Sequence, residues 1–282
     1  MSTTKAPNAK AGFVRATLGS LSTLYDRRFL IKYMAQREVS RSHRGSYLGF
    51  AWMFLSPLMT VALLTLIFSE MLGIRFREVT GDSSLNFGLF LYCGLVPFMA
   101  YSEALTKGVN VIRRNSNLVQ GVLFPVEILP VTTVVATFLQ NIVGIGVLMA
   151  VLLVLEQRVH LTAFLLPLVF VPQLLFTLGL CYLMAVAGTY VPDVRETLRI
   201  VVRATFFITP ILFPSGKVPE KYSFLIDYNP LASLVDAYRN LILEGKLPSG
   251  SGALYFSLIA LVLFTVGFVV FNRTKHKFAD LL

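Results

Sequence analysis

Charged residues are scarce in this chain. Only 14% of its 282 residues are Asp, Glu, Lys or Arg, whereas 55% are hydrophobic and the mean hydropathy is +0.70. These proportions lie far from the usual composition of a soluble domain. The stretches between the apolar runs are too short to form a soluble catalytic domain. The sequence therefore indicates an integral membrane protein.

Residues that could carry chemistry are equally sparse. His43, His160 and His276 lie far apart, without the spacing of metal ligands. Cys93 and Cys181 lie inside apolar runs and match no metal or redox motif, so we interpret them as small buried hydrophobic residues. No pair of acids falls within one apolar run, as a magnesium-dependent phosphotransferase of the membrane would need. We expect no enzyme activity, no metal and no cofactor in this chain.

The chain also lacks an evident energy source. Gly216 and Lys217 are the one trace of a phosphate-binding loop, but Ile211 stands where that motif needs glycine and no Ser or Thr follows. Glu103 and Arg203 lie near the ends of apolar runs, whereas proton-coupled carriers bury several ionisable groups at mid-membrane. No internal repeat indicates an inverted-repeat carrier.

Long apolar runs are what the chain has in abundance. A helix needs about 20 residues to cross the hydrocarbon core, and six runs reach or approach that length. The predicted spans are 48–72, 87–105, 128–155, 161–191, 197–213 and 253–271. We expect an all-α membrane protein with a cytoplasmic N-terminal region over 1–45, a transmembrane domain over 46–275 and a cytoplasmic C-terminus over 276–282.

The basic residues predict the orientation. With six spans and the N-terminus inside, the inner segments hold 18 Lys and Arg residues and the outer segments hold 7. Basic residues favour the cytoplasmic side, so both termini are expected there. Topology also explains the net charge of +10 better than a nucleic-acid partner does.

The residues before the first span predict an amphipathic helix. Its apolar row is Leu18, Leu21, Tyr25 and Phe29, and its basic row is Arg37, Arg41 and Arg44. Such a helix would lie along the membrane surface with its basic residues near anionic headgroups of the membrane lipids. The alternative is a soluble helix packed on the cytoplasmic side.

The region before the last span is interrupted. The fifth run is short and ends at Pro214, and residues 218–247 hold small apolar pieces broken by Pro230. This pattern predicts short re-entrant helices, which need a protein or aqueous surrounding. An extramembrane loop is the alternative.

The loop from Lys107 to Ile128 holds a candidate partner-binding helix. Asn115, Ser116 and Asn117 offer an N-cap, and Pro125 stops the helix. The apolar face consists of Leu118, Val119, Val122, Leu123 and Phe124. A cytosolic partner could grip such a helix in a groove, although the helix could also lie on the membrane.

The chain carries several short motifs, which are spread from about residue 25 to 275. They are RGSYLGFAW at 44–52 with SP at 56–57, FLYCGLVPF at 90–98, RNSNL at 114–118, FPVEILP at 124–130, DVR at 193–195, TPILFP at 209–214, NPL at 229–231 and AYR at 237–239. In these motifs the chain resembles the permease subunits of ABC-2 type exporters. The resemblance is to the branch that exports O-antigen, capsular polysaccharide and teichoic acid, and O-antigen is favoured as the cargo.

This resemblance implies a homodimer that binds two copies of a separate ABC ATPase, which holds the ATP and magnesium. The movement that closes the ATPases would be passed to the permease in the bacterial inner membrane through residues 115–124. The resemblance also implies that a lipid-linked polysaccharide moves between the two permeases. Re-entrant helices within 218–247 would shape the outer end of that path.

Aromatic rings suit a sliding polysaccharide, because their flat faces pack against sugar C–H groups. The candidate path residues are Tyr47, Trp52, Tyr92, Phe98, Tyr101, Phe206 and Phe207. At each position, a residue that faces lipid, the core or the membrane interface is the alternative. The rival functions are an ABC-2 permease for a drug or small lipid, an ATP-independent secondary carrier, and a membrane-bound glycan enzyme.

Overall fold

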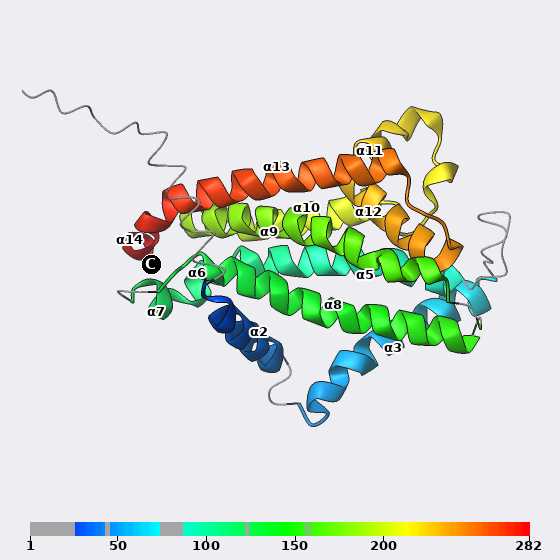
Figure 1. Ribbon diagram of the computed structural model, residues 1–282, viewed down its shortest axis with the longest axis horizontal. Helices are drawn as coiled ribbons and strands as arrows, with labels where there is room; N and C mark the ends of the chain where they lie inside the picture. Colours follow the sequence, from blue (N-terminus) through cyan, green and yellow to red (C-terminus); the bar gives the residue numbers. More distant parts are fainter. Residues whose placement is uncertain (1–25, 43–45, 74–86, 122–123, 156, 158) are drawn as a thin grey trace, which may run out of the picture.

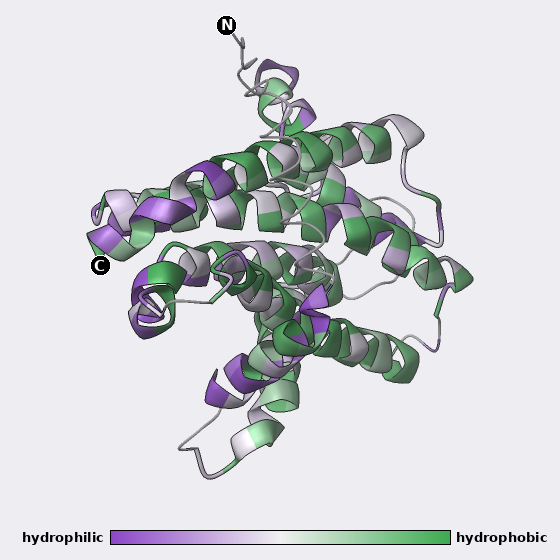
Figure 2. Ribbon diagram, turned by 60° about the vertical axis from the view of Figure 1, so that its left-hand side comes forward, coloured by the Kyte–Doolittle hydropathy of each residue, from purple (hydrophilic) through white to green (hydrophobic). Residues whose placement is uncertain are grey.

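The computed structural model describes residues 26–42, 46–73, 87–121, 124–155, 157 and 159–282. Every regular element within these residues is a helix, which confirms the all-α prediction. Five helical stretches are long and apolar enough to cross a membrane: Gly49–Met71, Phe87–Gly108, Ile128–Leu155, Leu161–Tyr190 and Gly250–Leu281. They form one bundle (Figure 1), and hydrophobic residues predominate along them (Figure 2).

These stretches carry the main elements of the fold. They are η1 (Gly49–Ala51), α3 (Trp52–Leu64) and η2 (Thr65–Met71), then α5 (Phe87–Gly108), α8 (Ile128–Leu155), η3 (Leu161–Leu165) and α9 (Leu166–Tyr190), and finally α13 (Gly250–Thr274), η7 (Lys275–Lys277) and α14 (Phe278–Leu281). One end of the bundle holds α6 (Val111–Arg114), α7 (Ser116–Val119) and α14. The opposite end holds α11 (Phe224–Asp227).

Helix α5 is the central element, with 16 of its 22 residues buried. It contacts α3, α8, α9 and α12 (Pro230–Arg239). The helix runs through Pro97, and side chains from two neighbours bond to its backbone there. Asn141 of α8 donates to the Val96 carbonyl at 2.7 Å, and Gln173 of α9 donates to the Pro97 carbonyl at 3.1 Å. Polar side chains thus hold three spans in register.

Helices α9 and α13 approach each other closely through glycine. A Cβ added to Gly179 would lie 2.5 Å from the backbone of Leu263, and one added to Gly267 would clash with the carbonyl of Gly179. Between membrane helices, small residues allow such backbone contact and the dispersion energy that it brings. This pair therefore forms a tightly packed wall of the bundle.

The fifth predicted span is a shorter helix than expected. We predicted a span over 197–213, whereas α10 is the 15-residue helix Val194–Ile208 and is not among the five candidate spans. Thr209 follows in an extended conformation and precedes Pro210, a position where proline disfavours helical backbone. Five of the six predicted spans thus correspond to long helices, and the remaining one corresponds to the shorter helix α10.

The interrupted region before α13 folds into short helices, and one of them enters the bundle. They are η4 (Ser215–Lys217), η5 (Glu220–Tyr222), α11, α12 and η6 (Asn240–Glu244). Phe224 of α11 and Tyr228, which follows this helix, are exposed, whereas Leu231, Val235 and Tyr238 of α12 are buried between α5, α9 and α13. The structure thus favours the re-entrant prediction over the loop for α12.

The N-terminal helix α2 (Arg28–Ser42) packs across α8. Ala35 and Val39 are buried against Ala136, while Phe29 is 72% exposed. Three members of the predicted apolar row, Leu18, Leu21 and Tyr25, lie outside the described residues, as does Arg44 of the basic row. The described part therefore joins the bundle through small apolar residues and turns Phe29 outward.

Candidate substrate face and coupling segment

Three of the predicted path aromatics gather between α5 and α10. Phe98 and Phe206 have ring centroids 5.4 Å apart, and Phe206 and Phe207 are 5.3 Å apart. They line an open hollow of about 440 Å³ together with Thr106, Arg199, Val202 and Arg203. Phe207 is 61% exposed, whereas Phe98 is buried. This surface offers flat rings and two guanidinium groups on one face of the bundle.

Tyr101 belongs to the core more than to this hollow. Its ring centroid lies 5.8 Å from that of Phe98 and 5.9 Å from that of Phe176, and only 7% of the residue is exposed. Phe176 in turn packs on Phe256, at 5.3 Å. Tyr101 thus connects the α5–α10 rings to the buried aromatic core.

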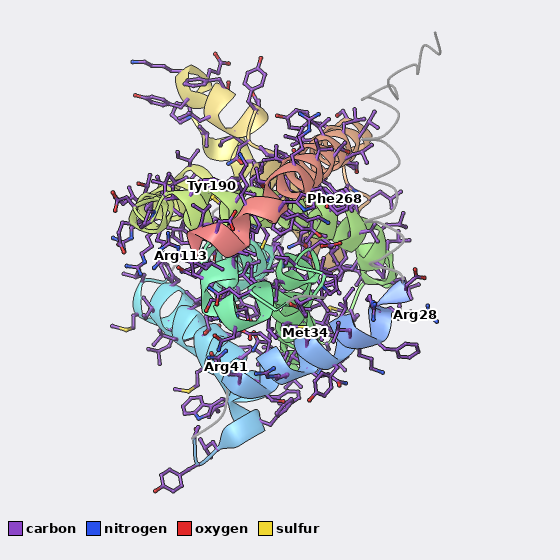
Figure 3. The ribbon with its side chains drawn as sticks, turned by 90° about the vertical axis from the view of Figure 1, so that its left-hand side faces the viewer. Arg28, Met34, Arg41, Arg113, Tyr190 and Phe268 are labelled. Atoms are coloured by element: carbon purple, nitrogen blue, oxygen red, sulfur yellow. The ribbon has the colours of Figure 1, made fainter. Side chains whose placement is uncertain are left out.

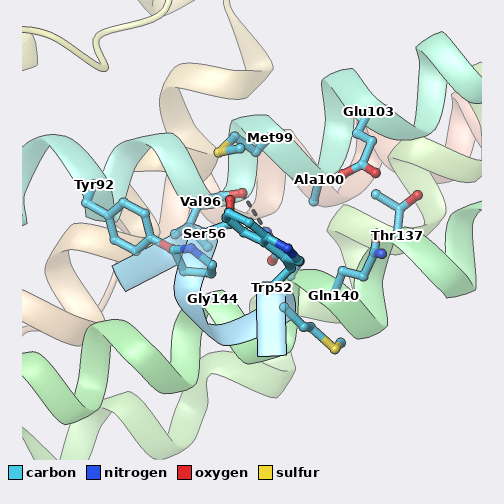
Figure 4. A pocket seen from close by; sticks show the side chains of 13 residues that line it. Trp52, Ser56, Tyr92, Val96, Met99, Ala100, Glu103, Thr137, Gln140 and Gly144 are labelled. Atoms are coloured by element: carbon cyan, nitrogen blue, oxygen red, sulfur yellow. Dashed lines mark hydrogen bonds between the residues drawn. The ribbon is translucent and has the colours of Figure 1, made fainter. Parts of the chain in front are cut away.

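Trp52 and Tyr92 line a second hollow, of about 200 Å³, between α3, α5 and α8 (Figure 4). Its polar lining includes Ser56, Glu103, Thr137, Gln140 and Asn141. The Trp52 indole nitrogen donates to the Ser46 hydroxyl at 2.7 Å, and Glu103 pairs with Lys107 at 2.6 Å. Tyr47 lines neither hollow and is fully exposed before η1. The predicted path residues are therefore divided among two hollows, the core and one exposed site.

The predicted partner-binding helix is the short helix α7. Asn115 occupies its N-cap, although the Asn115 side chain donates back to the Val111 carbonyl at 2.8 Å. Val119 is 7% exposed, and Leu118 and Phe124 pack against the core cluster. Ser116 is partly exposed and Asn117 is exposed, while Leu123 and Val122 lie outside the described residues. The described apolar side chains thus attach α7 to the bundle, and Asn117 points outward.

Ionic and polar contacts surround α7. Arg114 of α6 bonds to Glu38 of α2 at 2.7 Å, and Arg113 donates to the Thr189 carbonyl of α9 at 2.9 Å. On the other side, Glu127 bonds to Lys275 at 3.2 Å. The α7 segment is therefore tied to three different parts of the bundle.

Arg239 is a structural residue that the sequence analysis missed. The predicted topology counts it among the seven basic residues of the outer segments, but it is only 3% exposed. Its guanidinium donates to the carbonyls of Pro210 at 2.6 Å and Ile211 at 2.7 Å. These carbonyls follow the end of α10, where no further helix turn supplies donors. The available signal was that Arg239 is the one basic residue of this short, mostly apolar helix.

Neighbouring polar contacts complete this junction. The Ser215 hydroxyl lies 2.8 Å from both carboxylate oxygens of Asp236, and Asn229 donates to the Thr209 hydroxyl at 3.1 Å. Deeper in the bundle, the Tyr238 hydroxyl donates to Gln173 at 2.5 Å. Together these bonds fasten α12 to the end of α10 and to α9.

The described residues contain no group of three His, Cys, Asp or Glu side chains that could hold a metal ion. Cys93 and Cys181 are fully buried, which confirms their interpretation as small core residues. The geometry offers aromatic surfaces, polar hollows and an anchored loop helix, all of which suit binding and movement.

Comparison of the sequence with known proteins shows which proteins this chain resembles. Residues 29–243 match the sequence profile of the ABC-2 type transporter family. An O-antigen export system permease protein RfbA of Myxococcus xanthus is 27% identical over 259 residues, covering 91% of this chain and 96% of the relative. An RfbA protein of Klebsiella pneumoniae is 26% identical over 93% of this chain and 97% of the relative. The polysialic acid transport protein KpsM of Escherichia coli is 25% identical over 86% of this chain and 91% of the relative.

Proposed function

This chain belongs to the ABC-2 type transporter family, and we propose that it is the permease subunit of an ATP-driven exporter of a lipid-linked polysaccharide. The observation that carries the proposal is the match, over nearly the full length of both chains, to permeases named for O-antigen export. The match to a polysialic acid transport protein extends the comparison to a second polysaccharide. O-antigen is accordingly the cargo that we propose first, and the bacterial inner membrane is the proposed location.

The face between α5 and α10 is the proposed wall of the path. Two copies of the chain would form a homodimer and place these faces opposite each other. The rings of Phe98, Phe206 and Phe207 would pack on sugar C–H surfaces, while Arg199 and Arg203 would attract anionic groups of the cargo. The exposure of Phe207 excludes a role in the core alone, and its place beside Arg199 and Arg203 in the hollow supports the path over a lipid-facing position.

The energy would come from a separate ABC ATPase that binds ATP and magnesium. The proposed contact site is α7, at the end of the bundle where the C-terminus lies. Both termini would face the cytoplasm, as the basic residues predict. The outward position of Asn117 and the anchoring of α7 by Leu118 and Val119 suit a helix that is pushed by a partner.

The first test is purification of the tagged chain from its own membranes in mild detergent, with mass spectrometry of the proteins that come with it. A stoichiometric ABC ATPase is the expected result. Deletion of the gene should also remove surface polysaccharide and leave a lipid-linked intermediate inside the cell. A chain that purifies alone and transports without ATP would contradict the proposal and favour a secondary carrier.

A catalytically inactive ATPase partner is the matched control for this test. It should co-purify normally while export stops. If the ATPase co-purifies but surface polysaccharide is unchanged in the deletion strain, the chain serves another cargo, such as a drug or a small lipid.

A further inference from the structure

The segment around α7 has an ion pair on each side. Before it, Nη2 of Arg114 lies 2.7 Å from Oε1 of Glu38, which belongs to α2. After it, Oε2 of Glu127 lies 3.2 Å from Nζ of Lys275, which follows α13. Figure 3 views this end of the molecule, with α2 running from Arg28 to Arg41. The two pairs thus connect one short segment to two helices far apart in the sequence.

The pair between Glu127 and Lys275 is well shielded from solvent. The two side chains are 7% and 17% exposed, and the Tyr182 hydroxyl donates to the Glu127 carbonyl at 3.0 Å. Water and salt screen such a pair much less than an exposed one. The position of Glu127, immediately before α8, is therefore tied to the end of the last span.

The C-terminal helix α14 strengthens this side of the segment. Phe278 is fully buried, with its ring centroid 5.3 Å from that of Phe271 and 6.4 Å from that of Tyr190. Helix α14 contacts both α7 and α9. The chain after Lys275 is thus packed against the segment that the ion pair holds.

The pair between Arg114 and Glu38 is half-shielded, with side chains 31% and 16% exposed. Helix α2, which carries Glu38, is itself seated on α8 through Ala35 and Val39. A displacement of α6 and α7 would therefore act on α2 through this contact. Helix α7 itself has only four residues.

We propose that these two ion pairs are the connections through which movement of α7 reaches α2 and the last span. Glu38, Arg114, Glu127 and Lys275 act as positioning residues for coupling and make no contact with the ATPase themselves. This inference rests on the proposed function. Breaking either pair would leave the ATPase bound and active, but less polysaccharide would be exported for each ATP hydrolysed.

Charge reversal tests the proposal. Lys275→Glu and Arg114→Glu are compared with the exchanged pairs, Lys275→Glu with Glu127→Lys and Arg114→Glu with Glu38→Arg. Each single variant should lower export about tenfold, while ATPase co-purification and vanadate-sensitive ATP hydrolysis in membrane vesicles stay within about twofold. Each exchanged pair should restore most of the export. Export is measured as surface carbohydrate labelled by periodate oxidation.

The matched controls are Lys277→Glu and Lys32→Glu, which reverse exposed charges near Lys275 and on α2. Both should export normally. If a reversed single variant fails to accumulate in the membrane, Glu127→Gln and Glu38→Gln replace it, since both keep the side-chain shape. Single variants that export like the parent chain would overturn the proposal, as would exchanged pairs that restore nothing.

A loss of ATPase co-purification in the single variants would also overturn it, because the residues would then serve assembly. Failure of the proposed function gives a different result: in that case the parent chain itself brings down no ATPase and exports no polysaccharide.

Discussion

The guanidinium of Arg239 lies 3.7 Å from the centroid of the Phe90 ring, inside the bundle. The same group donates to two carbonyls beyond the end of α10, and Asp236 stands 4.0 Å away. A buried cation needs such compensation, because an unpaired charge in a low-dielectric interior is costly. Through this residue, the re-entrant helix α12, the central helix α5 and the short helix α10 share one junction.

Replacing Arg239 should therefore destabilise the protein. In Arg239→Ala, the Pro210 and Ile211 carbonyls lose their donors and Asp236 loses the guanidinium 4.0 Å away. We expect a loss of about 3–5 kcal/mol, measured as a large fall in the unfolding temperature in detergent. Arg239→Lys should recover only part of it, since an ammonium group cannot reproduce the planar fork of donors. Arg199→Ala, which removes an exposed arginine, is the control and should unfold near the parent temperature.

The contact between α9 and α13 should tolerate no added side-chain atom. Gly179→Ala places a methyl group against the backbone of Leu263, so the helices must separate. We expect a destabilisation of about 1–3 kcal/mol by the same thermal measurement. Gly146→Ala is the control, because no atom lies within 4 Å of its added Cβ. Alanine is also more favourable than glycine inside a helix. Equal unfolding temperatures for the two variants would contradict the close packing.

The aromatic face between α5 and α10 should matter for export more than for folding. Phe207→Ala removes an exposed ring, so the unfolding temperature should change little, whereas export should fall roughly threefold to tenfold if the ring contacts sugars. Phe164→Ala removes a ring that is 79% exposed near the start of α9 and should leave export unchanged. Normal export by Phe207→Ala and by Phe206→Ala would exclude this face as the path.

Substitutions in α7 should separate partner contact from anchoring. Asn117→Lys changes an exposed position and should weaken co-purification of the ATPase without altering thermal stability. Val119→Asp places a carboxylate in a buried site, so it should lower the unfolding temperature first. Leu118→Asp should show both effects, since Leu118 is partly exposed and also packs on the core. Loss of the ATPase in Val119→Asp with unchanged thermal stability would show that Val119 faces the partner.

The predicted path residues show how far sequence reasoning reaches into the site. The candidates were chosen as aromatic residues in or beside apolar runs, and their positions in the bundle could not be read from spacing. Phe98 and Phe206 are 108 positions apart and meet only because α10 lies on α5. Trp52 and Tyr92 meet in a separate hollow because α3 also lies on α5. Chain order alone does not tell which helices are neighbours.

The sequence by itself determined the helical class, the membrane character and the family. Hydrocarbon offers no hydrogen-bond partners to the backbone, so a long apolar run that crosses a membrane can adopt few structures. A helix is favoured because it satisfies its own backbone hydrogen bonds. The tertiary structure alone decided the burial of Arg239 and the two ion pairs beside α7. These features depend on partners from distant segments, such as Lys275 for Glu127 and the Pro210 carbonyl for Arg239. Local sequence pattern predicts the secondary structure of a segment. The free-energy cost of burying a charge depends instead on the partner that the fold brings to it, which local pattern does not reveal.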